Sequence, residues 1–281
     1  MTRLFGVLGH PITHSLSPVM HTAALRALKL DAVYGAFDAP PRFVAPILHA
    51  LILSGVEGLN VTVPLKQAVL PLLDRLDPTA RAMHAVNTIV VRHGRTTGYN
   101  TDGVGFVRGL EELGWKRGPT HAIILGAGGA ARAVAWELAH IPGSQVVIAN
   151  RHPGRASALA AWIRRQHPRS TVQAASLQHL SLAGAEVLVN ATTVGMRASD
   201  RLLVDPAQLR RSLMVYDLVY TRQTPLVQAA RRRGCVAANG LSMLLYQGAE
   251  SLRLWLHRAP PISAMRTALK KAVASEWQVE S

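Results

Sequence analysis

The chain has 281 residues, 49% of them hydrophobic, which is enough for one large domain or two ordinary ones with a true core. Thirty-one Lys and Arg against sixteen Asp and Glu give a net charge of +15, which favours anionic partners. The basic residues are scattered, however, and only 5% of residues are aromatic, so the sequence lacks the pattern of a nucleic-acid-binding protein. No membrane-spanning apolar run or secretory signal is present and the single Cys235 suits a reducing compartment, so we expect a cytoplasmic protein with neither membrane nor nucleic acid as partner.

Strand-like and helix-like segments alternate over the first third of the chain. Such alternation predicts an α/β domain with a largely parallel sheet. The strand-like segments are residues 4–9, 32–38, 58–63 and 87–92, and the helix-like ones are residues 18–28 and 42–55.

The segment GLNVTVPLK, residues 58–66, combines a strand pattern with a lysine in an unusual place. Asn60 and Thr62 alternate with apolar residues, so they share one face of the predicted strand. Pro64 suits the first position of a helix, which would put Lys66 in that helix's first turn, where the macrodipole disfavours a cation. A lysine that local electrostatics opposes is a candidate for chemistry.

A second unit is predicted to begin after a helix that ends at Gly114 and a break at residues 118 and 119. The segment HAIILGAGGAARAVAWELA, residues 121–139, places Gly126, Gly128 and Ala131 as G-x-G-x-x-A between a strand and a helix. Those glycines let backbone N–H groups approach a pyrophosphate at the helix N-terminus, which predicts a dinucleotide site. The alternative is a merely tight turn.

The next predicted strand, residues 145–150, is followed by NRHPGR without an acidic residue for a ribose hydroxyl. Asn150, Arg151 and Arg155 suit a 2′-phosphate instead, so NADP is favoured over NAD. Further strands are expected within residues 185–196 and 213–220. The last helices, residues 240–258 and 263–277, have no following strand and are expected to pack back on the first domain.

The twelve histidines invite a metal site, but neither H-E-x-x-H nor paired C-x-x-C spacing is present, so no metal is predicted. His10, His14 and His21 are expected to be structural or to face substrate.

Nine short blocks in order resemble the shikimate dehydrogenase family over nearly the whole chain. They are SLSP (15–18), GLNVTVPLK (58–66), AVNTI (85–89), NTDG (100–103), GAGGAAR (126–132), NR (150–151), NATTVGM (190–196), YDLVY (216–220) and GLSMLLYQGA (240–249). The resemblance implies NADPH-dependent reduction of 3-dehydroshikimate to shikimate, a step of the shikimate pathway to chorismate and the aromatic amino acids. The small-molecule substrate is then the expected partner, for a monomer or homodimer.

The expected fold is α/β, in three stretches of chain. A mainly parallel substrate domain is expected over residues 1–103 and a Rossmann-like, doubly wound NADP(H)-binding domain over 104–240. The C-terminal helices over 241–281 would complete the first domain.

The resemblance also implies a role for individual residues. Lys66 and Asp102 match the catalytic pair, with Lys66 donating and accepting the proton. The substrate-binding residues implied are Ser15, Ser17, Asn60, Thr62, Asn87, Tyr220 and Gln247. The cofactor-binding residues implied are Gly126, Ala127, Gly128, Gly129, Ala130, Asn150, Arg151, Arg155, Thr192, Leu218 and Gly240.

Simpler interpretations remain beside these roles. Ser17 before Pro18 fits an ordinary N-cap, Asp102 fits the N-cap of the following helix, and Lys66 fits a surface lysine. The chain also departs from the family pattern, with TRQ between Tyr220 and Thr224, Ala131 in place of a common serine, and His152 in place of a frequent threonine. Three other functions stay open: a quinate/shikimate dehydrogenase with relaxed cofactor use, a non-catalytic ligand-binding relative, and a basic nucleic-acid binder, whose affinity would fall steeply as salt rises.

Overall fold

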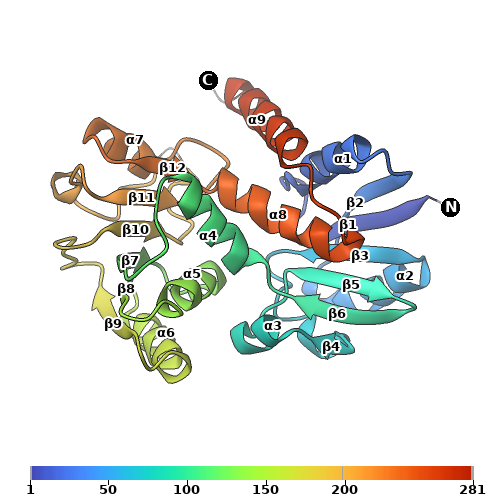
Figure 1. The fold of residues 1–281 in the computed structure, drawn as a ribbon, viewed down its shortest axis with the longest axis horizontal. Helices are drawn as coiled ribbons and strands as arrows, with labels where there is room; N and C mark the ends of the chain where they lie inside the picture. Colours follow the sequence, from blue (N-terminus) through green and yellow to red (C-terminus); the bar gives the residue numbers. More distant parts are fainter. Residues whose placement is uncertain (1, 198, 280–281) are drawn as a thin grey trace. The chain divides into compact units, whose positions relative to one another are not determined.

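The computed structural model describes residues 2–197 and 199–279 (Figure 1). They divide into two compact units. The first contains the chain up to Gly105 and from Leu245 onward, and the second contains Phe106–Leu244. The chain passes from one unit to the other within two helices, α4 (Asp102–Glu112) and α8 (Leu241–Leu256).

The first unit is built on a six-stranded sheet in the order β2-β1-β3-β5-β6-β4. The strands are β1 (Arg3–Gly9), β2 (Ala32–Asp38), β3 (Val56–Val61), β4 (Arg75–Leu76), β5 (Thr88–Arg92) and β6 (Arg95–Tyr99). β1 runs parallel to β2 and β3, and β4 runs parallel to β6. β5 is antiparallel to both β3 and β6, and it forms a hairpin with β6 that turns at His93 and Gly94.

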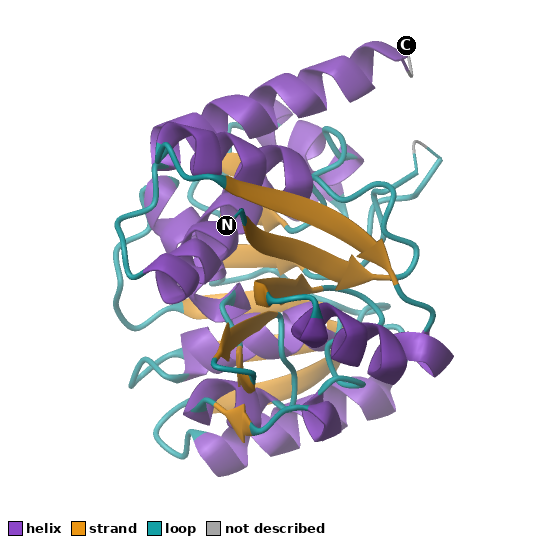
Figure 2. Ribbon diagram, turned by 90° about the vertical axis from the view of Figure 1, so that its right-hand side faces the viewer, coloured by secondary structure: helices purple, strands orange, loops and turns teal. Residues whose placement is uncertain are grey.

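Helices lie on both sides of this sheet (Figure 2). They are α1 (Ser17–Ala27), α2 (Val44–Leu53), α3 (Pro78–Met83), the part of α8 from Leu245 onward, α9 (Ile262–Val279) and two 3-10 helices, η1 (Pro41–Phe43) and η2 (Leu70–Leu72). Apolar residues of β1, β3 and β5 pack against α2 in one core. On the other side α9 lies beside α1 (Figure 1), so the prediction that the last helices return to the first domain is confirmed.

The helix expected to begin at Pro64 is not formed. The Val63–Pro64 peptide bond is cis, and residues 63–69 make successive turns in which Leu65 donates its backbone N–H to the Thr62 carbonyl. The prediction was wrong because proline fits the first position of a helix but does not start one. Lys66 therefore lies in a turn, and the macrodipole argument about its charge does not apply.

The second unit has a six-stranded sheet in the order β12-β11-β10-β7-β8-β9, and every pairing in it is parallel. The strands are β7 (His121–Leu125), β8 (Gln145–Asn150), β9 (Thr171–Ser176), β10 (Val187–Asn190), β11 (Met214–Asp217) and β12 (Ala237–Asn239). The helices are α5 (Gly129–Ala139), α6 (Pro153–Gln166), α7 (Pro225–Arg232) and the 3-10 helix η3 (Pro206–Gln208).

Both faces of the second sheet are buried, as its nearly continuous apolar strands predict. Within β7, Ala122 and Ile124 pack with α5 and α6, whereas Ile123 and Leu125 pack with α7. Alternate residues of one strand thus supply two cores. The strand order and the two covered faces confirm the predicted Rossmann-like, doubly wound domain.

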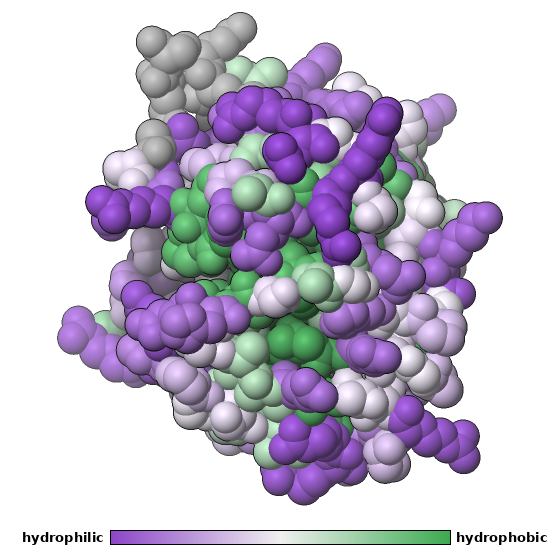
Figure 3. All heavy atoms as spheres, turned by 90° about the vertical axis from the view of Figure 1, so that its left-hand side faces the viewer, coloured by the Kyte–Doolittle hydropathy of each residue, from purple (hydrophilic) through white to green (hydrophobic). Residues whose placement is uncertain are grey.

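Over the described residues, no helix has the length and apolar character needed to cross a bilayer. Hydrophilic side chains are spread around the face drawn in Figure 3, with apolar surface between them, and they do not gather into one stripe.

Candidate active site

Lys66 and Asp102 meet in the first unit although they are 36 residues apart in sequence. Lys66 Nζ donates a hydrogen bond to Asp102 Oδ2 at 2.5 Å, and the two side chains are 26% and 10% exposed. The pair is shielded enough for a charge-assisted hydrogen bond to be strong, yet the ammonium still reaches solvent. The backbone carbonyl of Lys66 accepts from Val86 N–H at 2.8 Å, which ties the turn to the segment before β5.

Asn87 orients Asp102 from the other side. Its Nδ2 donates to Asp102 Oδ1 at 2.8 Å and also lies within hydrogen-bond distance of Thr101 Oγ1 and Gln247 Oε1. Its Oδ1 accepts from Thr101 N–H at 2.7 Å. α4 begins at Asp102, but both carboxylate oxygens accept from side chains, so the arrangement does not support a helix cap as the role of this residue.

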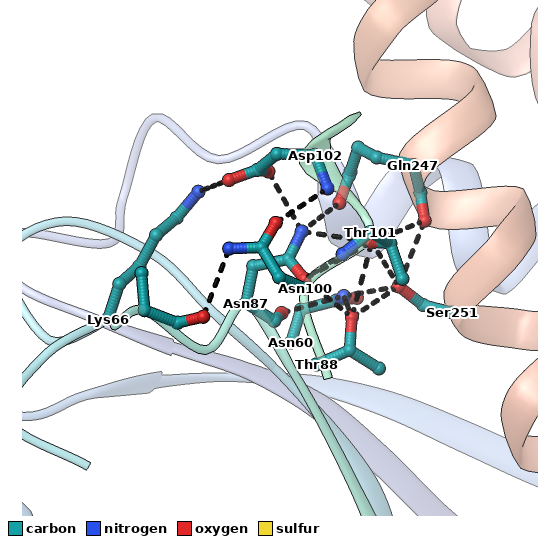
Figure 4. Close-up of polar contacts among 10 residues, drawn as sticks. Asn60, Lys66, Asn87, Thr88, Asn100, Thr101, Asp102, Gln247 and Ser251 are labelled. Carbon is teal, nitrogen blue, oxygen red and sulfur yellow. Dashed lines mark hydrogen bonds and ion pairs between the residues drawn. The ribbon is translucent and has the colours of Figure 1, made fainter. Parts of the chain in front are cut away.

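Beneath this pair lies a second layer of buried polar side chains, drawn in Figure 4. Asn60 Nδ2 donates to Ser251 Oγ at 2.9 Å, and Ser251 Oγ lies 2.7 Å from Thr88 Oγ1. The Thr101 and Ser251 hydroxyls both donate to the Gln247 carbonyl at 3.0 Å. The structure therefore joins Asn60, Asn87 and Gln247, from three distant segments, into one network with the Lys66–Asp102 pair.

Sequence reasoning missed Thr88, Thr101 and Ser251. Thr88 and Thr101 stand within the blocks AVNTI and NTDG, and Ser251 follows Gln247 by four residues on the same helix face, which is the signal that was available. Thr62, one residue beyond β3, is half-buried.

Ser15 and Ser17 stand at the start of α1, but neither caps it. The N-cap residue is Leu16, without a side-chain hydrogen bond, and Pro18 follows as the second helical residue. The N-cap interpretation of Ser17 was wrong because the helix begins at Ser17 itself. Ser15 Oγ accepts from Ser17 N–H at 3.3 Å, so its hydroxyl proton points elsewhere. Two hydroxyls at a helix N-terminus suit a carboxylate.

The glycine turn of the second unit has the geometry of a phosphate-binding loop. Gly126 has φ +114, and a Cβ there would lie 2.8 Å from the Ala191 carbonyl oxygen, so only glycine fits. By contrast, a Cβ on Gly128 or Gly129 would meet nothing within 4 Å. α5 begins at Gly129 with no side-chain cap and no acidic residue in its first turn, so the N–H groups of this turn are available to a pyrophosphate.

The end of β8 continues this pattern. Asn150 Oδ1 accepts from His152 N–H at 2.8 Å, and Arg151 and Arg155 are exposed. Among the residues with described side chains, none forms an ion pair with either arginine. Two free guanidiniums at the start of α6 fit the 2′-phosphate of NADP.

A buried cluster lies between the ends of β10 and β11. Asp217 accepts hydrogen bonds from Asn190 Nδ2 at 2.9 Å and from Thr224 Oγ1 at 2.6 Å. Burial raises the pKa of Asp217 to about 6, against the opposing hydrogen bonds from Thr224, Val219 and Asn190. Asn190 Oδ1 in turn accepts from the hydroxyl of Thr192 at 2.7 Å. The cluster thus fixes the loop that carries Thr192, which lies against Gly126.

The other residues predicted to bind the cofactor also belong to the second unit. A Cβ on Gly240 would lie 2.2 Å from the Leu218 carbonyl oxygen, so these two segments touch through their backbones. Ala127 and Ala130, within the glycine turn, are half-buried. Tyr220 belongs to the second unit, in the segment between β11 and α7, and is half-buried.

Three family models match successive parts of the chain. The shikimate dehydrogenase substrate binding domain matches residues 7–89, the shikimate / quinate 5-dehydrogenase model matches 114–224, and the shikimate 5′-dehydrogenase C-terminal domain matches 240–270. A shikimate dehydrogenase (NADP(+)) of Moorella thermoacetica is 44% identical over 98% of this chain and 95% of its own. The chain belongs to the shikimate dehydrogenase family.

Further relatives and solved structures match this chain over nearly its whole length. A shikimate dehydrogenase (NADP(+)) of Rubrobacter xylanophilus is 45% identical over 95% of both chains. The crystal structure of shikimate 5-dehydrogenase from Thermus thermophilus in complex with NADP(H) and shikimate has a TM-score of 0.87 and 38% identity, covering 96% of this chain and 100% of the other. Quinate dehydrogenase from Corynebacterium glutamicum in complex with NAD has a TM-score of 0.89 and 35% identity, covering 96% and 99%.

Proposed function

We propose that this protein is an NADP-dependent shikimate dehydrogenase that reversibly reduces 3-dehydroshikimate to shikimate in the shikimate pathway. The observation that carries the proposal is the Lys66–Asp102 pair, held by Asn87 in a chain whose second sheet has a phosphate-binding turn followed by free arginines. Family membership supports the same reaction. The single Cys235 suits a reducing compartment, so the cytoplasm is the compartment we propose.

The first unit binds the substrate. The Ser15 and Ser17 hydroxyls, at the start of α1, hold its carboxylate. Asn87, Gln247 and Thr62 face the ring hydroxyls. Asn60 lies in the buried layer beneath, where its amide oxygen accepts from Tyr34 and its amide nitrogen donates to Ser251. An unmatched buried polar group is costly, so such a site discriminates against rings with the wrong hydroxyl pattern.

The second unit binds the dinucleotide. The backbone of residues 126–130 and the start of α5 hold the pyrophosphate, and Thr192 lines the same turn. Asn150, Arg151 and Arg155 hold the 2′-phosphate, because a guanidinium grips a phosphate with two parallel donors. Leu218 and Gly240 flank the nicotinamide. When bound, NADPH supplies the hydride that adds to the C3 carbonyl carbon of the substrate.

Lys66 supplies the proton. On reduction its ammonium donates one proton to the C3 oxygen, which becomes the hydroxyl of shikimate, and on oxidation the amine accepts that proton back. Asp102 holds the ammonium in place through the 2.5 Å hydrogen bond and compensates its charge. Asn87 keeps the Asp102 carboxylate in one orientation. A positioned acid or base of this kind contributes about 10² to 10⁴ in rate.

A four-way assay tests the proposal. Absorbance of the reduced cofactor is followed with NADP⁺ or NAD⁺ and with shikimate or quinate, for the wild type and for Lys66→Ala. We expect the highest kcat/KM for NADP⁺ with shikimate. Highest efficiency for NAD⁺ with quinate would identify a quinate dehydrogenase instead, and no turnover in any pairing, with binding of shikimate retained, would identify a non-catalytic ligand-binding protein.

A further inference from the structure

Five exposed arginines gather beside the edge strand β12 of the second sheet, and neither proposed binding site uses them. They are Arg210 and Arg211, in the segment before β11, and Arg231, Arg232 and Arg233, in the last turn of α7 and at its C-cap position. α7 packs against β11 and β12, which are neighbours in the sheet (Figure 1). We call these five residues the arginine cluster.

Contacts between the two segments place the arginine cluster on one surface. The Arg233 guanidinium donates to the Leu209 and Ala207 carbonyls, each at 3.4 Å. A Cβ on Gly234 would lie 3.5 Å from Cγ of Arg211, so the Arg211 side chain lies against the turn that follows α7.

Backbone carbonyls hold further members of the cluster in place. Arg231 donates from Nε and Nη2 to the Ala237 carbonyl at 3.2 and 3.1 Å, and Arg210 donates to the Leu182 carbonyl at 3.0 Å. A guanidinium has five N–H donors, so each keeps donors for another acceptor. Because these side chains are already ordered, a partner that binds them loses less conformational entropy.

The charge of the arginine cluster is not compensated within the described part of the chain. Among the residues with described side chains, no carboxylate forms an ion pair with any of the five arginines. The acidic residue Asp205, nearby in sequence, accepts the backbone N–H of Ala207 at 2.9 Å instead. Five positive charges of a chain with net charge +15 therefore stand together.

The cluster lies at the sheet edge opposite the glycine turn. It surrounds the amino ends of β11 and β12, whereas Gly126 follows the carboxyl end of β7. All pairings in this sheet are parallel, so amino ends share one edge and carboxyl ends the other. A partner on the cluster would leave the dinucleotide turn accessible.

An exposed apolar side chain indicates what kind of partner fits. Val236, the residue before β12, is 50% exposed. Arginine beside apolar surface is typical of protein interfaces. A phosphate backbone would use the guanidiniums but not the valine, and the cluster contains no aromatic residue on which bases could stack.

We propose that the arginine cluster and Val236 dock an acidic segment of another protein, one rich in Asp and Glu with apolar residues between them. Carboxylates pair with guanidiniums through two parallel hydrogen bonds. The net charge of +15 also speeds the encounter with an acidic partner. The inference goes beyond the proposed function and does not depend on it.

Fluorescence anisotropy with a labelled peptide of Asp, Glu and Leu tests the inference, beside a peptide of equal length with Asn and Gln in place of the acids. The variant Arg211→Glu, Arg232→Glu reverses two charges and keeps the arginines that hold backbone carbonyls. The control variant Arg165→Glu, Arg169→Glu makes the same change of net charge at two exposed positions of the same unit, in the last turn of α6 and just beyond it.

We expect the wild type to bind the acidic peptide and not the amide peptide. The Arg211, Arg232 variant should bind the acidic peptide about 10-fold or more weakly, because like charges then face each other, and the control variant should bind it as the wild type does. Both variants should keep kcat/KM for shikimate with NADP⁺, since neither changes a residue of the proposed sites.

Failure of the wild type to bind the acidic peptide would overturn the inference, and the arginines would then only complement the dipole of α7 and hold nearby loops. Equal binding by the two double variants would overturn it as well, because net charge alone would explain the affinity. Tighter binding of a short DNA duplex, lost in the Arg211, Arg232 variant, would replace the protein partner by a phosphate backbone. If that variant does not fold, Arg211→Gln with Arg232→Gln must weaken peptide binding where Arg165→Gln with Arg169→Gln does not.

Discussion

Asp217 places a carboxyl group in the core of the second unit, and its titration makes stability depend on pH. The side chain is fully buried, and burial raises its pKa from 3.8 to about 6. A pKa that is higher in the folded than in the unfolded protein means that folding takes up a proton between these two values. The contribution of Asp217 to stability is therefore fully present below 3.8 and is lost as pH rises through about 6.

The perturbation that isolates this effect is Asp217→Asn. One pKa unit is worth about 1.4 kcal/mol, so the Asp217 contribution to the free energy of unfolding grows by about 1.3 kcal/mol from pH 7 to pH 5. Asparagine keeps the shape without the titration, because its carbonyl accepts from Asn190 and Val219 while its amide N–H faces Thr224. Urea denaturation of both proteins at pH 7, 6 and 5 should show the wild type gaining about that much on the variant as pH falls.

Asp200→Asn is the control for this measurement. The pKa of Asp200 is lowered by hydrogen bonds from the backbone of Arg197 and Gly195, so its titration lies below the measured range. Its unfolding free energy should therefore run parallel to that of the wild type from pH 7 to pH 5. If Asp217→Asn also runs parallel to the wild type, the buried carboxyl does not titrate in this range and the reasoning is refuted.

Three further predictions concern turnover. Lys66→Ala should keep NADP⁺ binding, measured by fluorescence titration, while kcat falls by about 10² to 10⁴; a folded variant with normal kcat would remove Lys66 from the mechanism. Arg151→Asp should reduce kcat/KM with NADP⁺ far more than with NAD⁺, because it removes a phosphate partner and adds repulsion, and equal losses would show that Arg151 does not bind the 2′-phosphate. The double variant Ser15→Ala, Ser17→Ala should mainly raise the KM for shikimate, because contacts with the carboxylate, remote from C3, change little between ground state and transition state. An unchanged KM would show that the two serines do not hold the carboxylate.

The second unit was predictable from sequence because its signals are local. Gly126 is required by its own φ and by the nearby Ala191 carbonyl, and a buried parallel strand such as β7 is apolar along its length. The hairpin of β5 and β6 was not predicted, since RTTGY has few apolar residues and its pairing with β5 depends on tertiary contacts. The turn at Pro64 was predicted as a helix because proline is common at the first position of helices, but it is also common in turns.

The candidate site was only partly predictable, because its residues meet through the fold. Lys66 and Asp102 were paired by resemblance, and nothing in their spacing of 36 residues shows that they touch. Thr88 and Ser251 look like ordinary residues of a buried strand and a helix. Their hydroxyls gain meaning only where β5 and α8 bring them to 2.7 Å from each other. The sequence pattern predicts which strand or helix contains such a residue. Its role follows only from hydrogen bonds to residues that are distant in the sequence.

The polar groups of the two units separate the tasks of the proposed reaction. The network around Asn87 and Asp102 lies wholly in the first unit, and the cluster around Asn190 and Asp217 lies wholly in the second. Among these contacts of the described residues, the two sets share no residue. Effects on shikimate and effects on NADP⁺ should then appear in different kinetic constants. Lys66 differs from the other residues of the first set, because its proton is needed only when substrate and cofactor are bound together. Its substitution is therefore expected to lower kcat.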